Sequence, residues 1–166
     1  ADMGGNMVGS SFEHPATRRA AKYWAAETKR QYINVQHDDT LGHVTAEHYS
    51  NIVTPDTRVV TILHASPVTG ISVDLEKISE AVRSNSPEAL IIVDGVQYAA
   101  HGGIKIDDYD IDGYAISPYK MYSRHGYGFA WVSDRLTQLQ HDQLLEGPSD
   151  NWELGTRDTG SYATLS

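Results

Sequence analysis

Short apolar runs alternate along this chain with stretches in which apolar residues recur every three or four positions. Residues 59–63 form an uninterrupted, β-branched run, as expected of a strand that is covered on both faces. Asp74 then stands where it can cap an amphipathic helix that reaches about residue 84. The same signals predict strands at 7–10, 32–35, 90–93, 114–116 and 129–132, and helices over about 15–28 and about 45–51.

Strands that alternate with amphipathic helices predict an α/β fold, in three layers (α/β/α) around a mostly parallel sheet. The last two strands are too close in the sequence for a helical crossover, so we expect them to pair antiparallel or to flank a functional loop. Ligands bind at the carboxyl ends of strands in such sheets. His64, Asp94 and Ser117 each close or follow a predicted strand. The pattern therefore predicts one cleft at that edge.

Composition narrows the classes of partner. The net charge of −9 argues against nucleic acid and against anionic membranes. No apolar run approaches the ~20 residues of a membrane helix, and no basic-then-apolar signal segment opens the chain. The sequence has no cysteine, which excludes disulfides and thiolate metal sites. A cytoplasmic location is compatible with these features.

Asp94 and Lys120 carry the most informative chemistry. Asp94 ends an apolar run, and Lys120 follows 26 positions later (120 − 94) in a Ser-Pro-Tyr-Lys turn. A carboxylate and an amine at neighbouring strand ends are the two charges that pyridoxal phosphate requires. The lysine forms a Schiff base with the aldehyde, and the carboxylate keeps the pyridine nitrogen protonated. Taken singly, the two residues are equally typical of a helix cap and a surface turn.

The residues around this pair resemble those of fold-type I pyridoxal-phosphate enzymes, and more narrowly the class V aminotransferase and cysteine desulfurase family. The two central segments are VDGVQ at 93–97 and SPYK at 117–120. Further segments match in the family's order: FEH at 12–14, HASPVTG at 64–70, GYG at 126–128 and ELGT at 153–156. The resemblance thus spans nearly the whole chain.

The resemblance implies a role for each matching residue. Lys120 would be the aldimine lysine and the acid/base of the reaction, and Asp94 would pair with the pyridine nitrogen. His14 would stack on the cofactor ring and act with Lys120 in catalysis. The remaining cofactor-binding positions would be Gln97 at the phenolic oxygen, Ser117 at the phosphate, and Tyr119, which stands where many relatives have a histidine.

Thr156 matches a threonine that in relatives reaches the phosphate of the neighbouring subunit. The resemblance therefore implies a homodimer in which Thr156 contributes to the partner's site. Two departures stand out: Ser66-Pro67 replaces the Ser-Asn of many relatives, and Arg124-His125 replaces small residues. The first removes or alters one polar contact, and the second adds charge near the cofactor entrance.

The resemblance places residues 1–166 within the cofactor-binding large domain. The upstream phosphate-binding turn and the C-terminal small domain of relatives have no counterpart in this sequence. We expect an enzyme that acts on an amino acid, with cysteine desulfurase or C–S lyase chemistry first. The alternatives are transamination or epimerisation, and a catalytically incomplete fragment with a structural or interaction role.

Two other sites were considered from the residues alone. Dinucleotide binding is disfavoured because no G-x-G-x-x-G follows the first strand. A metal site is suggested by eight histidines, but their spacing matches no metal-binding pattern. We therefore expect pyridoxal phosphate and no metal.

Overall fold

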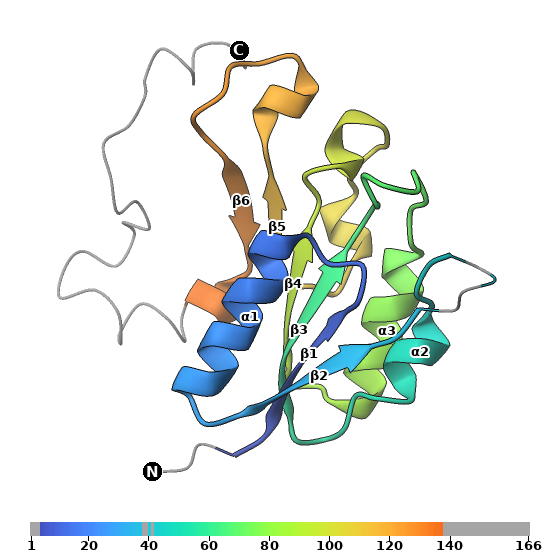
Figure 1. Cartoon of the computed structure of the whole chain (residues 1–166), viewed down its shortest axis with the longest axis vertical. Helices are drawn as coiled ribbons and strands as arrows, with labels where there is room; N and C mark the ends of the chain where they lie inside the picture. Colours follow the sequence, from blue (N-terminus) through green and yellow to red (C-terminus); the bar gives the residue numbers. More distant parts are fainter. Residues whose placement is uncertain (1–3, 38–39, 41, 138–166) are drawn as a thin grey trace, which may run out of the picture.

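The computed structural model describes residues 4–37, 40 and 42–137. These residues form a six-stranded sheet with the order β2-β1-β3-β4-β5-β6 (Figure 1). The strands β1 to β5 run parallel, and β6 pairs antiparallel with β5. Their bounds are β1 (Asn6–Ser10), β2 (Gln31–Val35), β3 (Thr57–Leu63), β4 (Leu90–Asp94), β5 (Gly113–Ile116) and β6 (Phe129–Val132).

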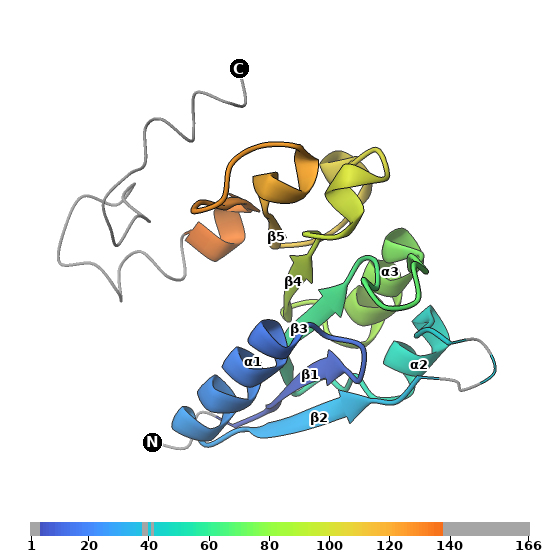
Figure 2. The same cartoon turned by 45° about the horizontal axis from the view of Figure 1, so that its top comes forward.

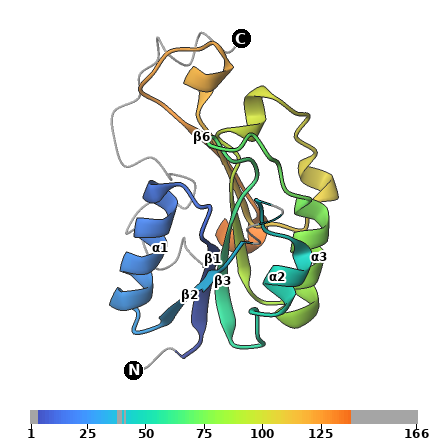
Figure 3. The same ribbon diagram turned by 45° about the vertical axis from the view of Figure 1, so that its right-hand side comes forward.

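Helices cover both faces of the sheet and make three layers. α1 (Pro15–Glu27) lies on one face, while α2 (Ala46–Ser50) and α3 (Leu75–Asn85) lie together on the other (Figure 3). The main core fills the space beneath α2 and α3, where each fully buried Ile or Val contributes roughly 1.5–3 kcal/mol. It is built from Val8, Val60, Ile62, Ile91 and Val93 of the sheet and from Tyr49, Ile78 and Val82 of the helices.

Side-chain caps explain where α2 and α3 begin. Asp74 Oδ1 accepts a hydrogen bond from the backbone N–H of Lys77 at 3.2 Å, which satisfies one of the first N–H groups of α3. Thr45 and His48 form a reciprocal capping box at α2. Because the capping residues can be recognised in the sequence, the start of both helices was predictable.

The predicted elements are confirmed, with bounds that shift by one or two residues. The largest change is in β3, which begins at Thr57 rather than at residue 59. The buried Thr57 hydroxyl donates to Asn6 Oδ1 at 2.9 Å, so a polar contact extends the strand beyond its apolar run. Between β4 and β5 the sequence analysis predicted no element, and the chain forms the 3₁₀ segments η1 (Tyr98–Ala100) and η2 (Ile106–Asp108).

The carboxyl ends of the parallel strands meet at one edge of the sheet. There η1 packs against η3 (Pro118–Met121), the 3₁₀ turn that follows β5 (Figure 2). The connections from β1 lead toward β2 on one side and those from β3 toward β4 and β5 on the other. This edge is where α/β sheets bind ligands. In the described part of the chain, no helix has the length and apolar character needed to cross a bilayer.

Candidate active site

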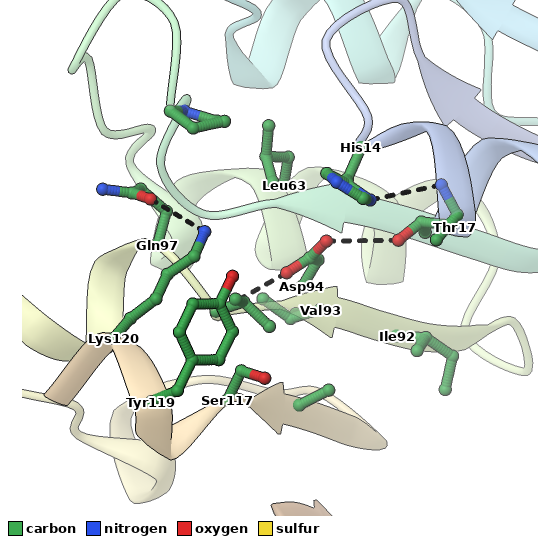
Figure 4. Close-up of a pocket in the computed structure, with 14 residues that line it drawn as sticks. His14, Thr17, Leu63, Ile92, Val93, Asp94, Gln97, Ser117, Tyr119 and Lys120 are labelled. Atoms are coloured by element: carbon green, nitrogen blue, oxygen red, sulfur yellow. Dashed lines mark hydrogen bonds between the residues drawn. The ribbon is translucent and has the colours of Figure 1, made fainter. Parts of the chain in front are cut away.

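A cavity of about 350 Å³ opens at the carboxyl ends of β3, β4 and β5. Apolar side chains such as Leu63, Ile92 and Val96 form part of its wall. Its polar lining residues come from segments far apart in the sequence and point toward one another (Figure 4). They are His14, Thr17, Asp94, Gln97, Ser117, Tyr119 and Lys120.

Asp94 is the last residue of β4, and both of its carboxylate oxygens are engaged. Oδ1 accepts a hydrogen bond from the backbone N–H of Val96 at 3.1 Å, and Oδ2 accepts one from the Thr17 hydroxyl at 3.2 Å. Two donors from different elements fix the orientation of the carboxylate.

Gly95 after this aspartate is required by packing. A Cβ at Gly95 would stand 2.0 Å from the ring of Tyr114, so no other residue fits without displacing that ring. The Asp-Gly pair therefore lets β4 end in a carboxylate while β5 packs directly behind it.

Lys120 extends from η3 into the cavity. Its Nζ donates a hydrogen bond to Gln97 Oε1 at 3.0 Å (Figure 4), and the Nε2 atom of the same amide lies 3.3 Å from His101 Nε2. An ammonium group only donates hydrogen bonds, so the amide oxygen faces Lys120 and the amide nitrogen is left to donate to His101.

His14 and Tyr119 lie at the exposed rim of the cavity. His14 caps α1, because its Nδ1 accepts a hydrogen bond from the backbone N–H of Ala16 at 3.2 Å. Tyr119 is 40% exposed and stacks on His125, with 4.4 Å between the ring centroids. Two flat side chains thus line the cavity, His14 from the start of α1 and Tyr119 from η3.

The structure brings together all but one of the residues for which the sequence predicts a role in the site. His14, Asp94, Gln97, Ser117, Tyr119 and Lys120 all line the cavity. Thr156 lies outside the described residues. His64, which the strand pattern places near the same edge, is buried beside the cavity instead of lining it.

His64 belongs to an aromatic cluster next to β4. Its ring stacks on Tyr98 with 3.6 Å between centroids, and its Nδ1 lies 2.8 Å from the hydroxyl of Tyr114. Burial of the ring lowers the pKa of His64 to about 4, so the imidazole is neutral near neutral pH. We refer to His64, Tyr98, Tyr109 and Tyr114 as the His64 cluster.

Glu13 is the other buried ionisable residue beside the cavity. Burial raises the pKa of its carboxyl to about 7, hydrogen bonds from Ser10 oppose this rise, and the charge of Asp94 adds to it. The Oε1 atom lies within 3.5 Å of the backbone nitrogen of Ser10 and within 3.4 Å of its hydroxyl. Sequence reasoning marked Glu13 only as part of a motif and assigned it no role.

The two departures from the family pattern, Ser66-Pro67 and Arg124-His125, have structural consequences. The Ser66 hydroxyl accepts hydrogen bonds from the backbone N–H groups of Val68 and Thr69, both at 3.2 Å, and so stabilises its own turn. Pro67 presents its ring to the cavity where many relatives have an amide. Arg124 is exposed, and His125 contacts Tyr119.

Thr17 is the lining residue that sequence reasoning missed. It lies three positions after His14, so both residues face the same side of the first turn of α1. That spacing was the available signal. It becomes informative only once Asp94 is known to lie across from α1.

No group of three or more His, Asp or Glu side chains that could hold a metal ion occurs within residues 4–37, 40 and 42–137. Several histidines of the described residues instead cap helices or stack on other rings, as His14, His48 and His125 do.

The family profile described as "Aminotransferase class-V" matches residues 1–153. The chain belongs to this family, whose members are pyridoxal-phosphate enzymes.

Several individual relatives are described as cysteine desulfurases. The chain is 30% identical over 138 residues to a probable cysteine desulfurase of Mycoplasma pneumoniae, which covers 82% of this chain and 33% of that protein. The crystal structure of the Escherichia coli cysteine desulfurase CsdA is similar with a TM-score of 0.74 and 25% identity, over 83% of this chain and 33% of that one.

A complex of the cystine C–S lyase C-DES with cysteine persulfide shows the same fold, with a TM-score of 0.74 and 22% identity over 83% of this chain and 37% of that one. The chain therefore spans about a third of the length of each of these proteins.

Proposed function

We propose that this chain is part of a pyridoxal-phosphate enzyme that removes sulfur from a cysteine-like amino acid, as cysteine desulfurases and C–S lyases do. The observation that carries the proposal is the convergence of Lys120, Asp94 and His14 on one cavity, from segments more than 20 residues apart in the sequence. Residues 1–166 form part of the large, cofactor-binding domain in this proposal.

The donor set of the cavity fits the cofactor. A flat, anionic, hydroxylated pyridine needs a carboxylate for its ring nitrogen, a donor for its phenolic oxygen and an amine for its aldehyde. Asp94, Gln97 and Lys120 supply these three groups in one cavity. The Ser117 hydroxyl does not cap η3 and so remains available for a phosphate.

Pyridoxal phosphate, when bound, supplies an aldehyde for an amine and a ring that withdraws electrons from the α-carbon of the substrate. The residues of the chain hold the cofactor and transfer protons to it and to the substrate. Asp94, fixed by Thr17 and Val96, would hold a proton on the ring nitrogen. His14 would cover one face of the ring, Tyr119 would offer its hydroxyl as a donor, and the Lys120 amine would take up and return a proton at the substrate.

The likeness to cysteine desulfurases and C–S lyases supports sulfur removal. The products distinguish a desulfurase from a lyase. A desulfurase yields alanine and passes the sulfur to a thiol, whereas a lyase yields ammonia and a keto acid. Because the sequence has no cysteine, an acceptor thiol must come from outside these residues.

A homodimer and a cytoplasmic location are part of the same proposal. The dimer is supported by the likeness of Thr156 to a threonine that serves the neighbouring subunit. Light scattering gives the mass directly. Mixing Lys120→Ala chains with Thr156→Ala chains would restore one intact site per dimer, whereas a monomer would gain nothing. Cell fractionation tests the location.

Cofactor attachment is tested by adding pyridoxal phosphate to the chain and recording visible absorbance before and after borohydride reduction. Wild type should hold the cofactor through dialysis after reduction, and Lys120→Ala should not. Lys105→Ala is the matched control, because Lys105 is exposed and pairs only with the neighbouring Asp108 at 3.6 Å. Equal retention by Lys120→Ala and wild type would contradict the proposal.

A further inference from the structure

Glu13 is a buried acid that the proposed function leaves unused. It is 2% exposed and lies between the end of β1 and the start of α1. Its Oε1 has long contacts to the backbone nitrogen and hydroxyl of Ser10, the backbone of Leu63 also lies near the carboxyl, and Oε2 is buried without a well-formed hydrogen bond in the described residues. A carboxylate in such surroundings is costly, because burial removes it from bulk solvent and no lysine or arginine of the described residues forms an ion pair with it.

Other unpaired polar atoms surround this acid. The Tyr32 hydroxyl and Thr61 Oγ1 are also buried without a partner in the described residues. Both approach Gly9, where a Cβ would stand 2.6 Å from the first and 2.5 Å from the second, so they lie within about 5 Å of each other. Burial and then the charge of Glu13 raise the pKa of Tyr32, so the acid interacts with one of these two hydroxyls, and neutral groups suit such surroundings better than an anion.

The charged and titratable groups around Glu13 come from four elements. Asp94 of β4 repels a charge on Glu13. Tyr32 of β2 and Tyr49 of α2 have pKa values raised by burial and further by Glu13. Arg18 of α1 acts on Tyr32, and its Nη1 donates to the backbone oxygen of Ser11 at 3.3 Å rather than to Glu13.

We propose that Glu13 is a positioning residue that stores a proton in the free chain and releases it when a cationic group compensates the charge of Asp94. The cationic group in question is the protonated ring nitrogen of the cofactor, so this inference rests on the proposed function. Glu13 thereby couples cofactor binding to proton release and strengthens the negative field that Asp94 presents to the ring.

The direction of the coupling follows from the charges. Burial raises the pKa of Glu13 to about 7, and the charge of Asp94 contributes to this rise as long as no cation lies against Asp94. A cation against Asp94 removes the repulsion and lowers that pKa. Near pH 7 the carboxyl then loses part of its proton.

Calorimetry of pyridoxal-phosphate binding at pH 7, in two buffers of different ionisation enthalpy, counts the protons released. The cofactor and Lys120 exchange protons of their own, so the test is the difference between variants. Wild type should release a fraction of a proton more than Glu13→Gln. Glu80→Gln, which removes an exposed carboxylate on α3, should match wild type. The affinity of wild type should also rise more steeply with pH than that of Glu13→Gln, by at most about tenfold per pH unit.

Infrared spectroscopy tests the same inference without cofactor. Wild type at pH 7 should show the carbonyl band of a protonated carboxyl, and Glu13→Gln should lack it. Asp94→Asn should weaken the band, because the repulsion is gone, and Glu13→Asp should retain a band that responds to pH.

The outcomes separate the two claims. Equal proton counts for wild type and Glu13→Gln, or a band that Asp94→Asn leaves unchanged, would overturn the coupling. If pyridoxal phosphate does not attach to Lys120, the proposed function is overturned. The infrared comparison needs no cofactor, so it would still decide whether Glu13 and Asp94 are coupled.

Discussion

Two buried ionisable side chains, His64 and Glu13, lie near Asp94, and they differ in how many partners they have. His64 has a stacking partner in Tyr98 and a hydrogen bond to Tyr114. Glu13 has long contacts to Ser10 and one oxygen with no partner in the described part of the chain. The His64 cluster is satisfied in one protonation state and rigidifies the edge of the sheet. Glu13 lacks a full set of partners, and burial raises its pKa to about 7, so its protonation can change near neutral pH.

The first prediction concerns the His64 cluster. His64→Ala should lower the free energy of unfolding by about 3 kcal/mol at pH 7, because it removes a stacked ring and leaves the Tyr114 hydroxyl buried without a partner. Urea denaturation measures this loss. His125→Ala, which removes an exposed ring at the cavity mouth, should cost far less, and similar losses for the two variants would break the comparison.

The second prediction separates the two residues by the sign of their pH dependence. Glu13 has a folded pKa of about 7 against an ordinary 4.5, so its contribution to stability is full below pH 4.5 and declines as the pH rises to 7. His64 has a folded pKa of about 4 against 6.5, so its contribution is full above pH 6.5 and declines as the pH falls to 4. Each change amounts to at most about 3 kcal/mol.

The measurement for this prediction is a series of denaturation curves between pH 4 and pH 8. Relative to wild type, Glu13→Gln should become more stable as the pH rises through its window. The variant His64→Phe, which removes this one imidazole, should become relatively more stable as the pH falls. Two difference curves with the same slope would show that the residues do not titrate as the structure indicates.

A third, smaller effect is expected at Tyr114. Tyr114→Phe keeps the ring that packs against Gly95 and removes only the hydroxyl that meets His64 Nδ1. It should cost about 1 to 2 kcal/mol of unfolding free energy, because one buried ring nitrogen is left unpaired. Tyr122→Phe, at a fully exposed ring, is the control. If Tyr114→Phe lost as much unfolding free energy as His64→Ala, the Tyr114 hydroxyl rather than the stacking of His64 on Tyr98 would stabilise the cluster.

The smallest predicted effect is at Thr17, which joins α1 to Asp94. Thr17→Val keeps the shape and removes the hydroxyl that donates to Asp94 Oδ2. Pyridoxal-phosphate affinity should fall a few-fold, in line with the ~1 kcal/mol of one hydrogen bond to a charged group in a partly exposed site. Thr17→Ser should restore it. An unchanged affinity in Thr17→Val would show that Val96 alone orients Asp94.

The sequence was sufficient for the fold because its signals are local. Apolar runs marked the strands, and Asp74 and Thr45 marked helix starts that the structure confirms. The bounds of β3 were wrong by two residues because the Thr57 hydroxyl finds Asn6 across the sheet, which no local pattern reveals.

Strand ends suggested Asp94 and Ser117, and the family resemblance suggested the other cavity residues; the structure places them around one cavity, and their chemical roles stay predictions. The roles of Thr17 and Glu13 could not be found in this way. A threonine in a helix and a glutamate before a histidine have ordinary local meanings. Only tertiary packing, which places one against Asp94 and buries the other without a full set of partners, makes them informative.

The most direct test of the central claim is peptide mapping by mass spectrometry after pyridoxal phosphate and borohydride treatment. The chain has five lysines, at positions 22, 29, 77, 105 and 120. The account predicts that the cofactor mass is found on Lys120 at stoichiometric level, with the other four lysines largely unmodified. Equal labelling of all five, or labelling that spares Lys120, would contradict it.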